Sequence, residues 1–216
     1  MALFADSFQG GPVFEVFSPQ GSDPTQLWKV CGGKAVKRVY DKSVKGNVYS
    51  IAGGPGCKMQ LPKDERKSMS LVQPYLVFQF FIPEGQALSF ELSVSDQGGT
   101  RRRLMFSTAF SDVKATPLHC QLPLGSLRRG VWNNVVLPVA DIVAQCFRGQ
   151  SHRAVELIAL GAVCKLRKVF TLRQAPPVEA DGGEDGLYIA AGEPIPRAAD
   201  FPPGVGCTTQ LLGFGG

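Results

Sequence analysis

Short runs in which apolar and polar residues alternate constrain this chain to a fold made of strands. In the clearest run, Leu88 to Asp96, apolar residues at positions 88, 90, 92 and 94 alternate with Ser and Glu. A period of two is typical of a strand with one buried face. The turn Asp96-Gln97-Gly98-Gly99 follows, and an extended run restarts at Arg101 to Thr108. We therefore predict a β-hairpin whose glycines supply the positive φ of its turn.

Two further runs, Tyr75 to Ile82 and Ala154 to Val163, are apolar on both faces. They suit central strands covered on both sides, although a buried helix would give the same continuous hydrophobicity. The other strand candidates are Val13 to Ser18, Leu27 to Val30, Val36 to Tyr40, Asn47 to Ala52, Lys58 to Leu61, Pro117 to Leu124, Trp132 to Leu137 and Lys165 to Leu172.

Helical spacing is scarce in this sequence. The one good candidate follows Pro138, where apolar residues recur at positions 142, 143, 146 and 147 before Gly149 ends the run. About ten strands with a single short helix predict an all-β fold, either a two-sheet β-sandwich or a jelly roll.

We predict a domain at residues 1–173 and a tail at residues 174–216. The tail holds 9 Gly and 6 Pro in 43 residues, a density that disfavours regular elements and a buried core. We therefore expect a disordered tail. Its two apolar islands, Leu187 to Ala190 and Leu211 to Phe214, offer the alternative of docking on the domain or on a partner.

The sequence shows no sign of export, of a membrane span or of a metal site. Residues 1–10 lack the basic start and apolar core of a signal peptide. Every apolar run is far shorter than the roughly 18 residues that cross a bilayer. The six cysteines form no Cys-x-x-Cys pair, and His119 and His152 are not at metal-ligand spacing from them. We expect a soluble intracellular protein with reduced thiols, no cofactor and no metal.

A catalytic constellation cannot be assembled from the sequence. The loop Gly32-Gly33-Lys34-Ala35 lacks the upstream Gly and the Ser or Thr of a phosphate-binding loop. The adjacent carboxylates Asp64 and Glu65 lie among cations that neutralise them. His119 reads as an ordinary strand histidine, and His152 falls in a predicted loop. We predict that the chain is not an enzyme.

The charge of the chain divides into a basic domain and an acidic tail. The overall charge of +5 comprises 22 Lys and Arg against 12 Asp and Glu in residues 1–173, and 1 against 6 in residues 174–216. The domain therefore carries +10 and the tail −5. A basic fold suits an acidic partner, whether nucleic acid, anionic lipid or an acidic protein surface.

Three clusters of cations are the candidate contacts for such a partner. Strand alternation places Arg101 and Arg103 on one face and Arg102 on the other. A second cluster occupies a strand, and a third falls in a loop between strands. The predicted contact residues are Arg101, Arg102, Arg103, Lys165, Arg167, Lys168, Lys63, Arg66 and Lys67. We expect them to form one shared patch.

Alternation in the second cluster is imperfect. It turns Leu166, Phe170 and Leu172 inward and the neighbouring cations outward, but Lys168 breaks the pattern.

Several stretches carry a joint resemblance to a known family. They are Phe8-Gln9-Gly10-Gly11, Glu15-Val16-Phe17-Ser18, Leu27-Trp28-Lys29, Arg101-Arg102-Arg103 after a glycine turn, Trp132-Asn133 leading into Val139 to Phe147, and the basic strand Cys164 to Leu172. In this order and spacing they resemble the domain of the cilia- and flagella-associated protein 20 family, over roughly residues 1–173. Thr116-Pro117-Leu118-His119 and the basic strand look most like the branch that carries this module at its amino end.

The resemblance implies a β-sandwich of the carbohydrate-binding-module type that acts as a structural, microtubule-associated part of the axoneme in a cilium or flagellum. The family's best-known member sits at the inner junction of the doublet microtubule. The implied partners are tubulin and other axonemal proteins, with the chain a monomer in a larger assembly and without membrane contact. Gly53-Gly54-Pro55-Gly56 and the tail depart from that member.

Two alternatives stay open from the residues themselves. One is a nucleic-acid-binding sandwich that uses the same basic charge. The other is a glycan-binding module with an aromatic platform at Trp28 or Trp132.

Overall fold

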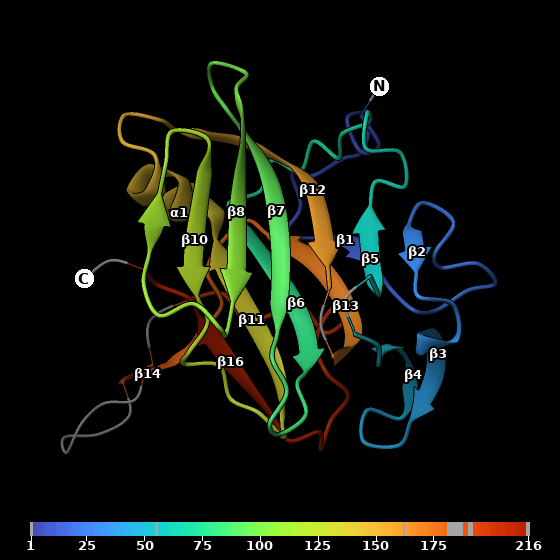
Figure 1. Cartoon of the computed structure of the whole chain (residues 1–216). Helices are drawn as coiled ribbons and strands as arrows, with labels where there is room; N and C mark the ends of the chain where they lie inside the picture. The colour runs from blue at the N-terminus through green and yellow to red at the C-terminus, as the bar shows by residue number, and fades with distance from the viewer. Residues whose placement is uncertain (1, 55, 162, 181–187, 190–191, 215–216) are drawn as a thin grey trace.

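The protein folds into two β-sheets packed face to face, as a computed structural model shows (Figure 1). The structure describes residues 2–54, 56–161, 163–180, 188–189 and 192–214. The predicted all-β sandwich is confirmed. Among these residues, no helix is both long and apolar enough to span a membrane.

The described elements run in the following order along the chain. The strands are β1 (Val13–Phe17), β2 (Lys29–Cys31), β3 (Val36–Asp41), β4 (Gly46–Ile51), β5 (Lys58–Leu61), β6 (Tyr75–Phe81), β7 (Ser89–Asp96), β8 (Arg101–Ser107), β9 (Lys114–Ala115), β10 (His119–Pro123), β11 (Trp132–Pro138), β12 (His152–Leu160), β13 (Cys164–Leu172), β14 (Glu179–Ala180), β15 (Tyr188–Ile189) and β16 (Cys207–Leu211). The helix α1 spans Val139–Cys146, and a 3-10 turn, η1, spans Gly33–Ala35.

We name the two sheets after central strands. The β6 sheet has the order β16-β11-β6-β13-β4-β3, with β1 added against β13. The β7 sheet has the order β2-β5-β12-β7-β8-β10-β9. Two pairs, β11 with β16 and β8 with β10, run parallel. The strands β2 and β3 therefore each lie at one edge of their sheet, and β9 and β16 lie at the other edges.

Aromatic rings join the two sheets. The ring centroids of Phe78 and Phe80 in β6 lie 5.2 and 6.1 Å from that of Phe90 in β7. The Phe90 ring stacks on Phe106 of β8 at 4.6 Å. Full burial of such a ring contributes roughly 1.5–3 kcal/mol, and an aromatic pair adds about 0.5–1.5 kcal/mol. This cluster therefore contributes strongly to holding the sheets together.

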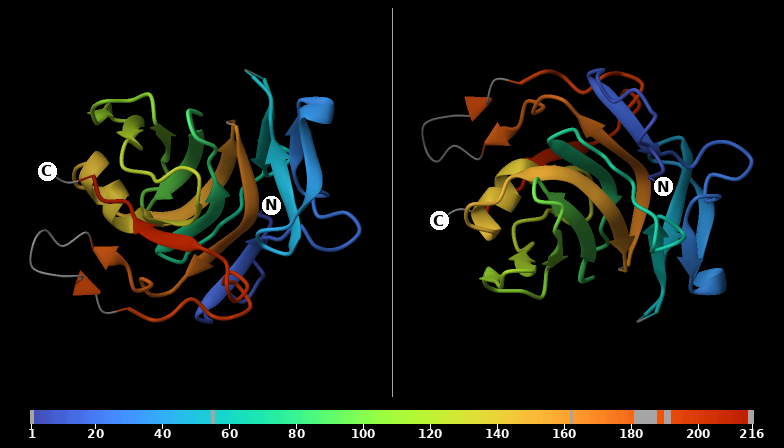
Figure 2. Two further views of the ribbon diagram at one scale, coloured as in Figure 1. Left: turned by 90° about the horizontal axis from the view of Figure 1, so that it is seen from below. Right: turned by 90° about the horizontal axis from the view of Figure 1, so that it is seen from above.

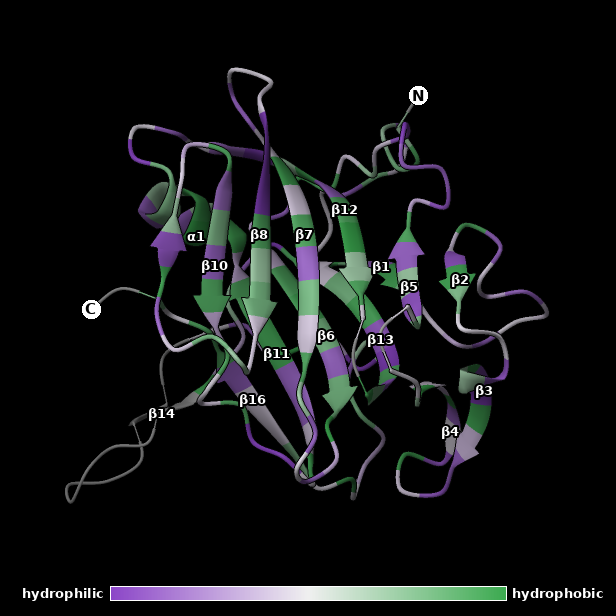
Figure 3. Ribbon diagram, in the orientation of Figure 1, coloured by the Kyte–Doolittle hydropathy of each residue, from purple (hydrophilic) through white to green (hydrophobic). Residues whose placement is uncertain are grey.

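Most strands appear close to their predicted bounds. The predicted hairpin is formed by β7 and β8, and Gly99 in its turn has a φ of +81°. Hydrophobic and hydrophilic bands alternate along β7 (Figure 3). The two runs that are apolar on both faces are strands, β6 and β12, and α1 begins directly after Pro138. His152 is the first residue of β12, so its predicted loop position is wrong: the strand starts before its apolar part.

A β-bulge interrupts the alternation of β13. The register between β13 and β6 shifts between Leu166 and Val169, and both of these residues face the core between the sheets. Phe170 and Leu172 instead pack on the outer side of the β6 sheet. The prediction that Phe170 and Leu172 turn inward with Leu166 is wrong, because an extra residue in one strand reverses the side chains beyond it.

Residues 192–205, which we name the strap, cross the outer face of the β6 sheet (Figure 2). Ala199 is 3% exposed and packs against Val77 of β6. Phe201 is 8% exposed, and its ring lies 5.7 Å from that of Trp132. The buried Gln79 of β6 donates its Nε2 to the backbone oxygen of Ala199 at 2.9 Å. The strap therefore covers the second apolar face of β6.

The chain then adds β16 as a parallel edge strand on β11. Leu212 is buried beyond this strand, and the Phe214 ring lies 5.8 Å from Phe106. The prediction that residues 174–216 hold no regular element is wrong for this part of the chain. The prolines of the strap lower the entropy lost on ordering, and the apolar anchors supply the burial. The island at 211–214 docks, whereas the island at 187–190 lies outside the described residues except for β15.

Truncation of the strap's aromatic anchor tests this packing. Phe201→Ala should lower the free energy of unfolding by about 3–5 kcal/mol, because it removes a buried ring and leaves a cavity. Urea denaturation of the whole chain measures the change. Phe8→Ala is the matched control, since Phe8 is 84% exposed, and it should stay within about 0.5 kcal/mol of the parent. Equal effects of the two substitutions would contradict a packed strap.

Candidate functional site

The three predicted cation clusters do not form one surface. Arg101 to Arg103 lie in β8 of the β7 sheet, whereas Lys165 to Lys168 lie in β13 of the β6 sheet. The outer faces of the two sheets point away from each other (Figures 1 and 2). The loop Lys63 to Lys67 follows β5. The prediction of one shared patch is wrong, because strand alternation does not reveal which sheet a strand joins.

Arg102 is part of the hairpin's internal structure. It donates from Nε and Nη2 to Asp96 Oδ2 at 2.9 and 2.7 Å. It also donates to the backbone oxygen of Pro117 and lies 5.1 Å from the centre of the Phe147 ring. The hydrogen bond from Arg102 lowers the pKa of the Asp96 carboxyl. Arg102 is 9% exposed, so it is not available to a partner.

The other two arginines of β8 lie on the outer face, as predicted. Arg103 donates to both carboxylate oxygens of Glu91 at 2.8 and 2.6 Å. Such an exposed pair contributes about 0–1 kcal/mol. Arg101 is exposed and forms no salt bridge with a described residue. Of this cluster, Arg101 is the cation most open to a partner.

Lys165 is bound to a buried carboxylate. Its Nζ lies 2.6 Å from Oδ2 of Asp41, and Asp41 is 8% exposed. Burial opposes ionisation of Asp41, but hydrogen bonds from Lys165 and Ser43 outweigh it and lower the pKa of this carboxyl. The charge of Lys165 is therefore compensated within the fold.

The strap covers the two remaining cations of β13. The guanidinium of Arg167 lies 5.1 Å from the centre of the Phe201 ring, and burial lowers its pKa. Lys168 donates to Glu15 Oε2 at 2.7 Å and to the backbone oxygen of Ala198 at 2.6 Å. These two side chains, which lie between the residues of the register shift, therefore contact the strap and help to hold it on the sheet.

The densest positive charge lies at one end of the sandwich. Ten of the 23 Lys and Arg fall between residues 29 and 67, against three acidic residues. These residues form β2 to β5 and their connections, which gather on one side of the molecule (Figure 2). We name this surface the basic end; its cations are Lys29, Lys34, Lys37, Arg38, Lys42, Lys45, Lys58, Lys63, Arg66 and Lys67. All except Lys29 and Lys58 are exposed.

The acidic residues of the basic end already have partners. Asp41 is bound by Lys165, Asp64 by Arg66 and Glu65 by Lys29. The lysines that form no salt bridge with a described residue are Lys34, Lys37, Lys42, Lys45, Lys58, Lys63 and Lys67. This end therefore carries a net +7, most of the charge of the domain.

Sequence reasoning found only three of these ten residues, namely Lys63, Arg66 and Lys67. That prediction used groups of cations that are close together in the sequence, and the alternation of side chains along strands. The signal that would have found the rest is the summed charge over residues 29–67.

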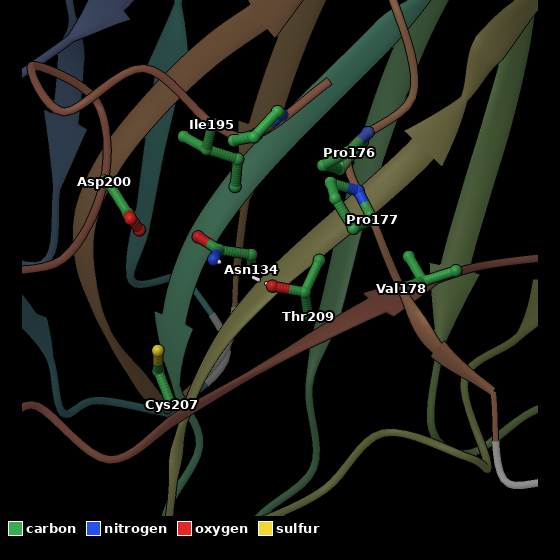
Figure 4. A pocket seen from close by; sticks show the side chains of 9 residues that line it. Asn134, Pro176, Pro177, Val178, Ile195, Asp200, Cys207 and Thr209 are labelled. Carbon is green, nitrogen blue, oxygen red and sulfur yellow. Dashed lines mark hydrogen bonds between the residues drawn. The ribbon is translucent and has the colours of Figure 1, made fainter. Parts of the chain in front are cut away.

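A cavity of about 370 Å³ lies between the strap and the β6 sheet (Figure 4). Its lining is Asn134, Pro176, Pro177, Val178, Pro194, Ile195, Asp200, Cys207 and Thr209. Asn134 donates to Thr209 Oγ1 at 3.1 Å and accepts from Gln79 at 3.0 Å. Asp200 accepts from the backbone N–H of Phe201 at 2.7 Å. These hydrogen bonds link Asn134 of β11 to β16 and β6, and link Asp200 to the backbone of the strap.

The two tryptophans cannot serve as an exposed sugar platform. Trp28 is 4% and Trp132 is 2% exposed. The Trp28 ring packs 5.0 Å from Phe17, and Trp132 Nε1 donates to Ser43 Oγ at 2.9 Å. The glycan-binding alternative therefore loses the platform that motivated it.

Measurements of stability test the structural role of Arg102. Arg102→Ala should lower the urea midpoint of unfolding, because it leaves the Asp96 carboxylate without its cation. Arg101→Ala, one residue away on an exposed side chain, should leave the midpoint unchanged. The stabilisation from Asp96 is present above its unfolded pKa and is lost as pH falls through the lowered folded value. If Arg102 served only to contact a partner, Arg102→Ala would leave the urea midpoint unchanged.

His152 gives a separate pH dependence. Burial lowers its pKa to about 4, against the opposing charge of Glu156, and Nε2 has no hydrogen-bond partner among the described residues. Between pH 6.5 and 4 the unfolded chain binds a proton that the folded chain does not, so stability falls as pH falls. His152→Gln should remove about 3 kcal/mol of this dependence. Denaturation at several pH values measures it, with the exposed His119→Gln as control.

In a comparison with known proteins, a family model described as the CFA20 domain matches residues 3–177. The chain is 26% identical over 171 residues to Cilia- and flagella-associated protein 20 of Chlamydomonas reinhardtii and, equally, of Paramecium tetraurelia, over 78% of this chain and 87% of each relative. It is 26% identical over 172 residues to the protein of that name in Caenorhabditis briggsae, over 78% of this chain and 82% of the relative. The matched region contains β1 to β13 and ends before the strap. The chain belongs to the CFA20 domain family.

Proposed function

We propose that this chain is a non-enzymatic structural module of the ciliary or flagellar axoneme that binds microtubules through its basic end. The observation that carries the proposal is the net +7 between residues 29 and 67, on β2 to β5 and their connections at one end of the sandwich. Microtubule surfaces are acidic, so charge complementarity favours this end for contact and accelerates encounter. The relatives named as cilia- and flagella-associated proteins support the cellular setting.

The strand β3 gives this surface its shape. Lys37, Arg38 and Tyr40 are exposed along the outermost strand of the β6 sheet. Arg38 donates to the backbone oxygen of Gly21 at 2.7 Å, which braces the loop before β2. Lysines on a free edge also prevent sheets from joining edge to edge. Both roles are compatible, because the same unpaired ammonium groups repel other sheets and attract an acidic surface.

Of the nine contact residues predicted from the sequence, Lys63, Arg66 and Lys67 belong to the basic end. The other six lie outside it, and Arg101 is the exposed residue among them that forms no salt bridge with a described residue. An inner-junction-like position in the doublet, with tubulin and other axonemal proteins as partners, is the finer form of the proposal. The strap and β16 lie beyond the region that the family model matches. The outer face of the β6 sheet is therefore covered in this chain, whereas it would be open in a domain that ended at residue 177.

Two charge-reversal variants separate the contribution of the basic end to binding from the contribution of the net charge. The first variant carries Lys34→Glu, Lys37→Glu, Lys42→Glu and Lys45→Glu. The matched control carries Arg101→Glu, Lys114→Glu, Arg148→Glu and Arg153→Glu, four exposed cations with the same total change. In microtubule co-sedimentation, the first variant should bind roughly tenfold more weakly or worse, while the control keeps most of its binding.

Binding of the parent should also weaken as salt rises, since exposed charges are screened. Equal losses in both variants would contradict a specific basic end. Failure of the parent to pellet with microtubules at low salt would refute the proposal, and tight binding to a mixed-sequence oligonucleotide instead would favour the nucleic-acid alternative.

A further inference from the structure

A second cavity, of about 360 Å³, lies within the basic end. Its lining comes from the N-terminal segment, the loop before β2 and the loop after β5: Leu3, Gln26, Leu27, Pro62, Lys63, Asp64 and Lys67. Backbone hydrogen bonds tie these segments together, from Lys63 N–H to the Leu27 oxygen and from Leu3 N–H to the Ser68 oxygen, both at 2.8 Å. These hydrogen bonds fix the segments that line the cavity relative to one another.

The cavity presents apolar groups to solvent. Leu27 is 46% exposed, while its neighbour Trp28 is anchored in the core against Phe17. Val30, at 38% exposed, lies on β2, which follows directly after Leu27 and Trp28. The partly exposed Leu27, in a cavity also lined by Leu3 and Pro62, offers an apolar contact to a side chain of another protein.

The rim of the cavity is positively charged. Lys63 and Lys67 form no salt bridge with a described residue. The one carboxylate in the lining, Asp64, is held by Arg66 through bonds of 3.1 and 3.2 Å. Free ammonium groups around an apolar floor select a ligand that is acidic and carries an apolar side chain. A uniform polyanion would satisfy the rim but not the floor.

We propose that this cavity binds a short acidic segment of a protein partner by taking one of its aliphatic or aromatic side chains. Lys63 and Lys67 contact flanking carboxylates, and Leu3, Leu27 and Pro62 enclose the anchor. This inference deepens the proposed function and rests on it: the basic end attracts the acidic surface, and the cavity selects one segment within it. The volume lies at the lower end of the range for ligand cavities, which fits a single side chain.

Two labelled peptides test the proposal by fluorescence anisotropy with the whole chain. One is a short run of Glu and Asp with a single central Phe, and the other carries Ser in place of Phe. The Phe peptide should bind roughly tenfold more tightly, the gain expected from burying one ring. Leu27→Ser should remove this preference and leave binding of the Ser peptide unchanged. Lys63→Glu with Lys67→Glu should weaken binding of both peptides.

Leu118→Ser is the matched control, because Leu118 is 47% exposed on another part of the surface. It should keep the tenfold preference. Equal affinity of the parent for the two peptides, or equal loss in Leu27→Ser and Leu118→Ser, would overturn the proposal. Circular dichroism confirms that each variant is folded, and Leu27→Lys provides a second disruption of the floor.

Co-sedimentation distinguishes this failure from failure of the proposed function. If the parent pellets with microtubules but shows no peptide preference, the cavity proposal alone falls. If the parent prefers the Phe peptide but does not pellet, microtubules are not the target and the proposed function falls, whereas the selection of an acidic segment by the cavity stands.

Discussion

Burial of β6 on both of its faces is the constraint on which the rest of the structure depends. Phe78 and Phe80 on the inner face pack against Phe90 and join the two sheets. Val77 and Gln79 on the outer face are fully buried because the strap covers them. A strand with two apolar faces needs a layer on each side, and here the second layer comes from the end of the same chain.

This arrangement determines which cations are available. Arg167 and Lys168 bind the strap, Lys165 binds Asp41, and Arg102 binds Asp96. These charges stabilise packing between segments that are distant in the sequence. The cations of β2 to β5 and their connections lie at one end of the sandwich, where only three acidic residues accompany them in the sequence. The positive field of the molecule is therefore concentrated at the basic end and not on β13, the basic strand that is most conspicuous in the sequence.

Much of the fold was predictable because strand patterns are local. The hairpin of β7 and β8, the two doubly apolar strands and the helix after Pro138 all follow from the spacing of neighbouring residues. The site was less predictable, because a cluster of cations becomes a surface only through pairing and sheet assignment. Arg101 to Arg103 illustrate the difference: three adjacent arginines have three different environments, exposed, buried with Asp96, and paired with Glu91.

The sequence by itself determined the all-β class, the strand positions, the basic domain and the family resemblance, because each depends on composition or on residues close together in the chain. Only the tertiary structure decided the bulge in β13, the internal pairing of its cations and the place of residues 192–214. Gly and Pro content predicted a disordered end, but composition does not reveal that Ala199 and Phe201 pack on an apolar sheet face that includes β6, more than a hundred residues earlier in the chain. Long-range burial outweighed local propensity, and it did so at the face that local pattern had already shown to need a cover.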